Sequence, residues 1–145
     1  MRAPDPTPGL VVRYSFLWWS EHRAGREEGV KDRPCAVVLV SLDEDGLKQV
    51  TVLPITHSPP GDPGAALELP AETKQRLGLD GLRSWIVLDE VNRFIWPGPD
   101  LVPRVRGDMS TVAYGHLPRA LMLELRRRIG VLAKARRLRT VRRTE

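Results

Sequence analysis

The chain has 145 residues, of which 41% are hydrophobic and 28% are charged, and its formal net charge is +5. This size and composition indicate a single domain with a modest core. No segment approaches the roughly 20 consecutive apolar residues of a membrane-spanning helix, so we expect no membrane partner. The single Cys35 excludes an internal disulfide and fits a reducing cytoplasm, and the N-terminus has no apolar signal segment.

The positive charge is concentrated at the C-terminal end. Between positions 118 and 145, ten Arg and Lys residues stand against two Glu, whereas residues 1–117 carry a net charge of −3. A basic end of this kind either binds nucleic acid or is a solvated, frayed helix end. We therefore expect a flexible proline-rich leader at 1–8, one domain at 9–134 and a basic tail at 135–145.

Strands are predicted where short β-branched or aromatic runs lie between Gly, Pro or acidic turns. The run at 33–41 is continuously apolar, which predicts a strand buried on both faces, and the turn at 43–46 joins it to the next strand as a hairpin. Residues 17–32 are polar and glycine-containing, which indicates a long mobile loop. The predicted strands are, in chain order, 10–16, 33–41, 48–55, 66–69, 84–89 and 91–96.

Helices are predicted at two places. Residues 70–77 form one or two turns that begin near Pro70 and stop at Gly78. After Pro118, apolar residues at helical spacing predict an amphipathic helix that docks on the sheet and frays after Lys134. Together the elements indicate an α+β protein, mainly β, built as a small curled sheet or barrel. The helical stripe consists of Leu121, Met122, Leu125, Ile129 and Leu132.

Two strand ends carry the most informative residues. Arg33 and Pro34 begin the second strand, and the third strand ends in Pro54-Ile55-Thr56. The pattern predicts one guanidinium and one hydroxyl at the ends of two neighbouring strands. A fixed positive charge beside a hydroxyl is suited to gripping a phosphodiester.

These motifs, in this order, resemble the PemK/MazF family of toxin endoribonucleases, and the resemblance extends from Gly9 to about Ile129. It implies an SH3-like barrel of the CcdB/MazF kind, with short antiparallel strands and a C-terminal helix. It also implies metal-independent cleavage of single-stranded RNA at short sequence contexts, with no cofactor. The expected partners are a second copy in a homodimer and a cognate antitoxin. The blocks that carry the resemblance are 9–12, 27–34, 50–56, 84–93 and the last helix.

The resemblance also implies roles for individual residues. Arg33 matches the arginine that stabilises the phosphorane, and Thr56 matches the threonine that hydrogen-bonds the phosphate. Asp89 corresponds to an acidic residue that some members use as a base. His57 directly follows Thr56, and a histidine exchanges protons near neutral pH. Val87 stands where some relatives have an arginine acid, which shifts the chemistry onto Arg33.

RNA contacts are expected from the segment before Arg33. Trp18 and Trp19 are suited to stacking on unpaired bases, although a lid over the core or a dimer face would use them equally well. Lys31 is the basic residue of the loop exit. His22 lies in the loop where some relatives place a catalytic histidine.

Each candidate also has a structural alternative. Arg33 could pair with Asp32, Glu27 or Glu28, and Thr56 could cap a turn. Asp89 could be a surface carboxylate, and His57 an inactive loop histidine. His116, just before the helix, is expected to be structural.

Two other functional classes remain open from the sequence. One is a non-catalytic module of the same fold that binds nucleic acid, or DNA gyrase as CcdB-like toxins do. The other is an adaptor that uses the tryptophan loop for a protein partner. If the protein is an enzyme, we expect Arg33 and Thr56 to share a groove beside Asp89 or His57. If it is a binding module, we expect Arg33 to be buried in a salt bridge. No Cys/His spacing indicates zinc, so we expect no metal site.

Overall fold

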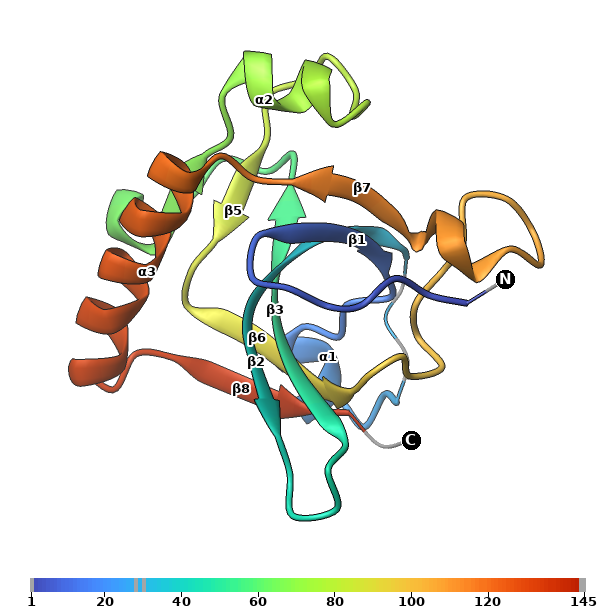
Figure 1. Ribbon diagram of the computed structural model, residues 1–145. Helices are drawn as coiled ribbons and strands as arrows, with labels where there is room; N and C mark the ends of the chain where they lie inside the picture. The colour runs from blue at the N-terminus through green and yellow to red at the C-terminus, as the bar shows by residue number, and fades with distance from the viewer. Residues whose placement is uncertain (1, 28, 30, 144–145) are drawn as a thin grey trace.

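The computed structural model describes residues 2–27, 29 and 31–143, in which eight strands form one sheet with three α-helices around it (Figure 1). None of the helices in these residues is long and apolar enough to cross a membrane. The α-helices are α1 (Trp19–Arg23), α2 (Ala71–Arg76) and α3 (Arg119–Lys134), and 3₁₀ turns lie at Pro63–Ala65 and Met109–Val112. The strands are β1 (Leu10–Tyr14), β2 (Arg33–Leu42), β3 (Lys48–Thr56), β4 (Ala66–Glu68), β5 (Trp85–Val87), β6 (Glu90–Ile95), β7 (Ala113–His116) and β8 (Arg139–Arg142).

The sheet branches at β3. Its main path is β4-β5-β3-β2-β1-β7, and β6 pairs with both β3 and β8. The first half of β3 pairs with β6, whereas its last two residues, Ile55 and Thr56, pair with β5. All pairs are antiparallel except β6 with β8, which is parallel, so the expectation of antiparallel strands is wrong for β8. The end of β3 therefore lies between β2 and β5.

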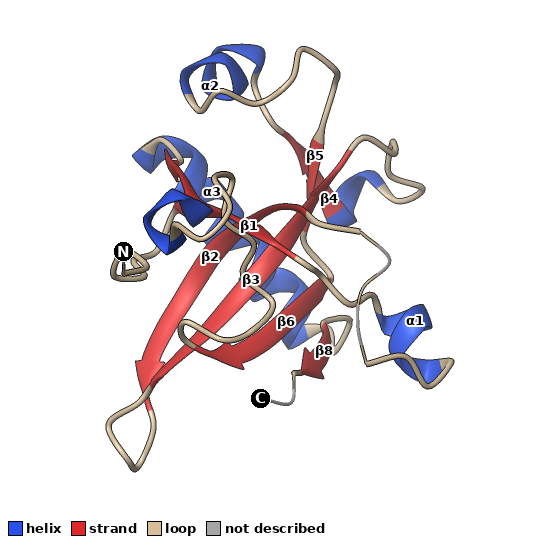
Figure 2. Ribbon diagram, turned by 90° about the vertical axis from the view of Figure 1, so that its right-hand side faces the viewer, coloured by secondary structure: helices blue, strands red, loops and turns tan. Residues whose placement is uncertain are grey.

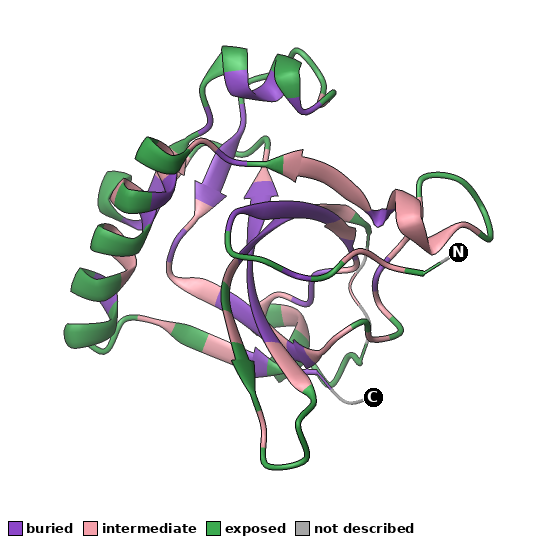
Figure 3. Cartoon of the chain, viewed as in Figure 1, coloured by how far each residue is buried: buried purple, intermediate pink, exposed green. Residues whose placement is uncertain are grey.

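The predicted β2–β3 hairpin is confirmed, and it projects from the sheet (Figure 2). The side chain of Asp43 accepts hydrogen bonds from the backbone N–H groups of Asp45 and Leu47, and Gly46 supplies the positive φ of 77°. The expectation that β2 is buried throughout is wrong. β1 pairs only with Arg33–Ala36, so the outer half lacks a neighbour on that side, and Leu42 is 70% exposed (Figure 3).

The core has two parts, one on each face of the central strands. Successive residues alternate between them: Val11 joins the first and Val12 the second, and Leu53 joins the first while Val52 joins the second. This is the period-2 geometry of a strand that is buried on both faces. The sequence pattern of β1 and the inner parts of β2 and β3 is explained by this double burial.

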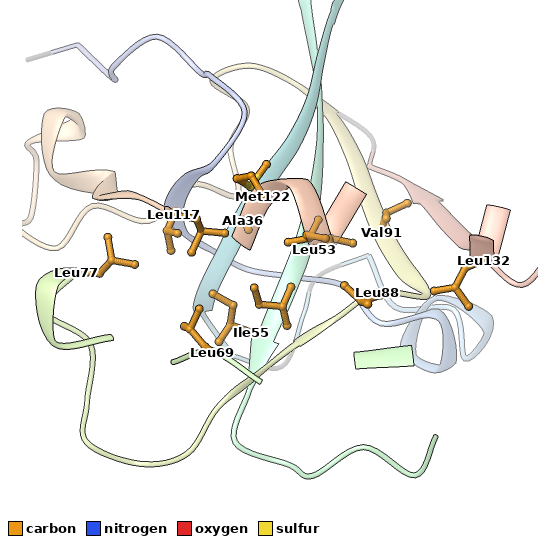
Figure 4. Close-up of a cluster of buried hydrophobic side chains, with 13 residues drawn as sticks. Ala36, Leu53, Ile55, Leu69, Leu77, Leu88, Val91, Leu117, Met122 and Leu132 are labelled. Atoms are coloured by element: carbon orange, nitrogen blue, oxygen red, sulfur yellow. The ribbon is translucent and has the colours of Figure 1, made fainter. Parts of the chain in front are cut away.

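The predicted amphipathic helix is confirmed as α3. Its stripe faces the first core, where Met122, Leu125 and Leu132 are buried and Leu121 and Ile129 pack at the edge. Figure 4 shows Met122 and Leu132 among side chains from the sheet and from the residues that flank α2, Leu69 and Leu77. Burial of each large apolar side chain contributes roughly 1.5–3 kcal/mol, so this stripe anchors the helix.

Three segments differ from the sequence-based expectation. The loop at 17–32 contains the short helix α1, and β7 lies before α3 where no strand was predicted. The expected basic tail does not remain a frayed end, because the chain turns after α3 and adds β8 to the sheet. Val141 is buried there, so the domain continues past residue 134.

The proline-rich leader lies against the domain instead of being detached. Pro6 is buried, Asp5 forms an ion pair with Lys48 at 3.1 Å, and Thr7 Oγ1 lies 2.7 Å from His116 Nε2. His116 thus makes the structural contact expected of it.

Candidate functional site

Arg33 and Thr56 are brought together by the register of two strands. β2 and β3 pair Cys35 with Pro54 at their last registered position, and continuing this register by two residues places Arg33 opposite Thr56. Residues directly opposite in an antiparallel pair have Cβ atoms about 5 Å apart on the same face. Thr56 also pairs with Trp85 of β5, so three strand ends converge here.

A cavity of about 150 Å³ lies at these strand ends, lined by Arg33, Thr56, His57 and Lys31 among others. We call it the Arg33 cavity. Its volume equals that of on the order of five water molecules in the liquid, which is room for a phosphate group. Four of the residues predicted from the sequence therefore share one site.

The guanidinium of Arg33 is held by an aromatic ring, and no carboxylate among the described residues neutralises its charge. Its Cζ lies 5.0 Å from the centroid of the Trp18 ring, a cation–π contact that fixes the plane of the guanidinium. Its Nε is buried and has no hydrogen-bond partner among the described residues. A buried donor left unpaired costs about 1–3 kcal/mol.

The predicted ion pairs of Arg33 are not formed within the described residues. Asp32 pairs with Arg13 instead, with Oδ2 and Nη2 at 3.6 Å, and the backbone oxygen of Glu27 accepts from Arg143. Glu28 lies outside the described residues, as does Val30 of the same motif.

The hydroxyl of Thr56 caps a turn and retains its proton for another contact. Oγ1 accepts a hydrogen bond from the backbone N–H of Ser58 at 3.2 Å, as the structural alternative predicted. A hydroxyl accepts and donates at the same time, so this contact leaves the O–H free to donate to a phosphate oxygen.

The uncompensated charge of the Arg33 cavity is positive. It contains two carboxylates, and each is already paired with a cation: Asp32 with Arg13, and Asp80 with Lys74. Arg33 and Lys31 have no ion pair among the described residues. The arrangement therefore favours an anion.

A hydrogen-bonded chain runs from the wall of this cavity into the protein. His57 Nε2 lies 2.8 Å from Asp80 Oδ2, and Asp80 Oδ1 accepts from Lys74 Nζ at 2.7 Å. The Lys74 side chain is 5% exposed, and its ammonium also donates to Ser84 Oγ at 2.7 Å and to the Leu82 backbone oxygen. Lys74 is the first cause that lowers the pKa of Asp80 to about 2, followed by the backbone N–H of Leu82 and then His57.

Sequence reasoning missed Lys74 and Asp80. Both lie more than 15 residues beyond Thr56 and belong to none of the motifs. One signal was present: Lys74 and Leu77 share a helical face of α2 three residues apart, and both are buried. A lysine on an apolar face indicates a paired ammonium.

Asp89 and Trp18 line an adjoining cavity of about 290 Å³, which shares Thr56 and Ser58 with the Arg33 cavity. Asp89 therefore lies across Thr56 from the space that holds Arg33 and His57. Val87, the residue in place of a family arginine, lines the same adjoining cavity. Trp18 belongs to both environments, since its ring also contacts Arg33.

The other two predicted RNA contacts lie on α1. Trp19 and His22 contact each other with ring centroids 6.0 Å apart, and the Trp19 backbone N–H donates to Glu90 Oε1 at 2.8 Å. Burial raises the pKa of Glu90. His22 lines a separate cavity with Arg142 and Arg143, so the structure does not bring it to Arg33.

The fold and the site define an α+β protein, mainly antiparallel sheet, with a positively charged cavity at converging strand ends. Within the part of the chain that is described, no group of three or more His, Cys, Asp or Glu side chains is arranged to hold a metal ion. Comparisons with protein-family models and with curated proteins give no match. The chemistry is therefore argued from these residues.

Proposed function

We propose that this protein is a metal-independent endoribonuclease that cleaves single-stranded RNA within short sequence contexts, as the toxins of the PemK/MazF family do. The observation that carries the proposal is that Arg33, which forms no ion pair with the described residues, lines the same cavity as Thr56. The barrel fold, the homodimer, the cytoplasmic location and the cognate antitoxin implied by the resemblance belong to the same proposal.

The proposed reaction is attack of a ribose 2′-hydroxyl on the adjacent phosphorus. The phosphorane gains negative charge, and Arg33 stabilises that charge with its fixed cation. Thr56 donates its hydroxyl proton to a phosphate oxygen. Lys31 attracts the RNA backbone towards the cavity. The products are a 2′,3′-cyclic phosphate and a 5′-hydroxyl.

The aromatic side of the site suits a base. Trp18 lines the larger neighbouring cavity that contains Asp89, and its ring contacts Arg33. An unpaired base can stack on such a ring with a gain of about 1–3 kcal/mol, without reading its sequence. Asp89 then lies near the ribose or base of a neighbouring nucleotide.

The test is a cleavage assay in EDTA on a long single-stranded RNA, with analysis of the product ends. Arg33→Ala and Thr56→Ala are each expected to reduce cleavage by on the order of 100-fold, since each removes one stabilising donor. Arg104→Ala is the matched control, because Arg104 makes the same 5.0 Å contact with a ring, that of Tyr114, outside the Arg33 cavity.

Site-selective cuts with 2′,3′-cyclic ends, lost in the two site variants but not in the control, would support the proposal. A folded wild type, free of antitoxin, that cuts no RNA would contradict it. The non-catalytic module would then be tested, first with DNA gyrase and then with nucleic acid.

A further inference from the structure

Phosphate binding alone does not require the hydrogen bonds that link His57 through Asp80 to the buried Lys74. An exposed carboxylate that only balanced Lys74 would not need to hold His57 as well. Asp80 instead uses one oxygen for each partner, Oδ1 for Lys74 Nζ and Oδ2 for His57 Nε2. The buried ammonium therefore fixes the carboxylate, and the carboxylate fixes the imidazole.

We propose that His57 is the proton-transfer group of the Arg33 cavity, and that Asp80, anchored by Lys74, is the positioning residue that sets its tautomer. The inference rests on the proposed ribonuclease function and adds two residues that belong to none of the sequence motifs. An ionised Asp80 accepts the Nε2–H of His57. Neutral His57 then carries its free lone pair on Nδ1, the nitrogen that can take a proton.

The reaction balances with these groups and water. The 2′-hydroxyl proton moves to Nδ1 of His57 as the 2′-oxygen forms its bond to phosphorus. The P–O5′ bond breaks, and the 5′-oxygen takes a proton from water. The hydroxide that remains takes the proton from His57, which returns to its neutral form. Arg33 and Thr56 hold the phosphate throughout.

Asp80 is suited to this role by its anchoring. The Lys74 ammonium lies 2.7 Å from Oδ1 of Asp80 and also donates to the Leu82 backbone oxygen and Ser84 Oγ, so its position is fixed by three acceptors. The backbone N–H of Leu82 donates to the same Oδ1 at 3.0 Å. Lys74 and Leu82 thus hold one oxygen of the Asp80 carboxylate, and His57 contacts the other oxygen.

The first measurement does not depend on cleavage. The ¹⁵N shifts of the histidine rings report which nitrogen carries the proton, and the chain has three histidines, so assignment is direct. In wild type at a pH where the ring is neutral, His57 is expected to be protonated on Nε2. In Asp80→Asn, both tautomers are expected. An unchanged tautomer in the variant would contradict positioning by Asp80.

The second measurement is the pH dependence of RNA cleavage. His57→Gln leaves the Asp80–Lys74 pair intact and is expected to reduce kcat by about 100-fold or more with little change in KM. Asp80→Asn is expected to reduce kcat by at least about tenfold and to alter the pH profile. The charged groups that share the cavity with His57 are Lys31, Asp32, Arg33, Lys74 and Asp80.

Matched controls are His116→Ala, which removes an exposed histidine bound to Thr7, and Glu68→Gln, which removes an exposed carboxylate bound to Arg83. Both are expected to keep the wild-type rate and profile. Cleavage that survives His57→Gln would contradict this inference alone. A folded wild type that cuts no RNA would contradict the ribonuclease proposal and, with it, the role of His57.

Discussion

Arg33 begins β2 and Thr56 ends β3, each two residues beyond the registered pair of Cys35 and Pro54. Because the strands are antiparallel, the start of one lies beside the end of the other. The guanidinium and the hydroxyl thus reach the same cavity although 22 residues separate them in the chain. A one-residue slip of either strand would send its side chain to the other face and separate the two groups.

The contribution of the Thr56 hydroxyl to cleavage can be measured separately from that of the side-chain volume. Thr56→Val keeps nearly the same volume and is expected to lose cleavage by on the order of 100-fold, whereas Thr56→Ser keeps the donor and most of the activity. Initial rates on one RNA substrate measure this. Thr140→Val in β8 is the control, and an equal loss there would indicate damage to the fold.

The C-terminal arginine is expected to be a stabilising element. The Arg143 side chain is 2% exposed, pairs with Asp100 at 3.1 Å, and donates to the Ser15 backbone oxygen at 2.6 Å. Arg143→Met leaves the partly buried Asp100 carboxylate without this cation and is expected to cost about 3 kcal/mol in urea unfolding, the lower end of the range for breaking a buried pair. Exposed Arg142→Met is expected to change stability by no more than about 0.5 kcal/mol. Equal effects of the two substitutions on stability would contradict a stabilising role for Arg143.

Acid should weaken the fold partly through Asp80. Lys74, the backbone of Leu82 and His57 lower its pKa from the ordinary 3.8 to about 2 in the folded protein. The stability that its pairs contribute is therefore fully present above pH 3.8 and is lost as the pH falls towards 2. In Asp80→Asn this part of the acid dependence is expected to disappear.

The measurement is the free energy of unfolding of both proteins across this pH range. Glu124, whose pKa is also lowered to about 2 by Arg127 and Arg128, is present in both, so its effect cancels in the difference. A difference that does not vary with pH would contradict the prediction.

Cys35 is expected to be inert in the folded protein. It is fully buried in β2, and burial raises the pKa of its thiol far above the ordinary range. Since the thiolate is the reactive form, a thiol reagent such as DTNB should modify Cys35 only after unfolding. Rapid modification of the native protein would show that β2 opens locally.

The amphipathic docking of α3 can be tested with one pair of leucines. Leu125 is fully buried and Leu123 is 58% exposed on the same helix. Leu125→Ala is expected to destabilise the protein by about 2–5 kcal/mol, because it removes core contacts and leaves a cavity. Leu123→Ala should cost well under about 1 kcal/mol. Thermal or urea unfolding of the two variants measures the difference.

Local patterns predicted the elements whose signal is local. The β2–β3 hairpin follows from apolar strands around a turn at Gly46, and α3 follows from apolar residues at helical spacing. β8 was missed because two of its four residues, Arg139 and Arg142, are basic and the segment resembles a solvated tail. Only pairing with β6 and burial of Val141 make that segment a strand.

The site was predictable in part for the same reason. Arg33, Thr56 and His57 lie beside strand ends that the sequence marks with proline, and the structure places all three in one cavity. Asp89 lies in the adjoining cavity and His22 in a separate one. The sequence places both near strand ends, but it does not determine the direction in which a loop carries its side chains.

The sequence by itself determined the α+β class, the hairpin, the terminal helix and the chemical types available at two strand ends, since periodicity and turn residues act over a few positions. Only the tertiary structure decided which charges remain unpaired. It joined Asp32 to Arg13 and Asp80 to Lys74 and His57. Among the described residues, it left the Nε of Arg33 without a hydrogen-bond partner. These pairings depend on strand register and on contacts between distant segments, which no local pattern encodes.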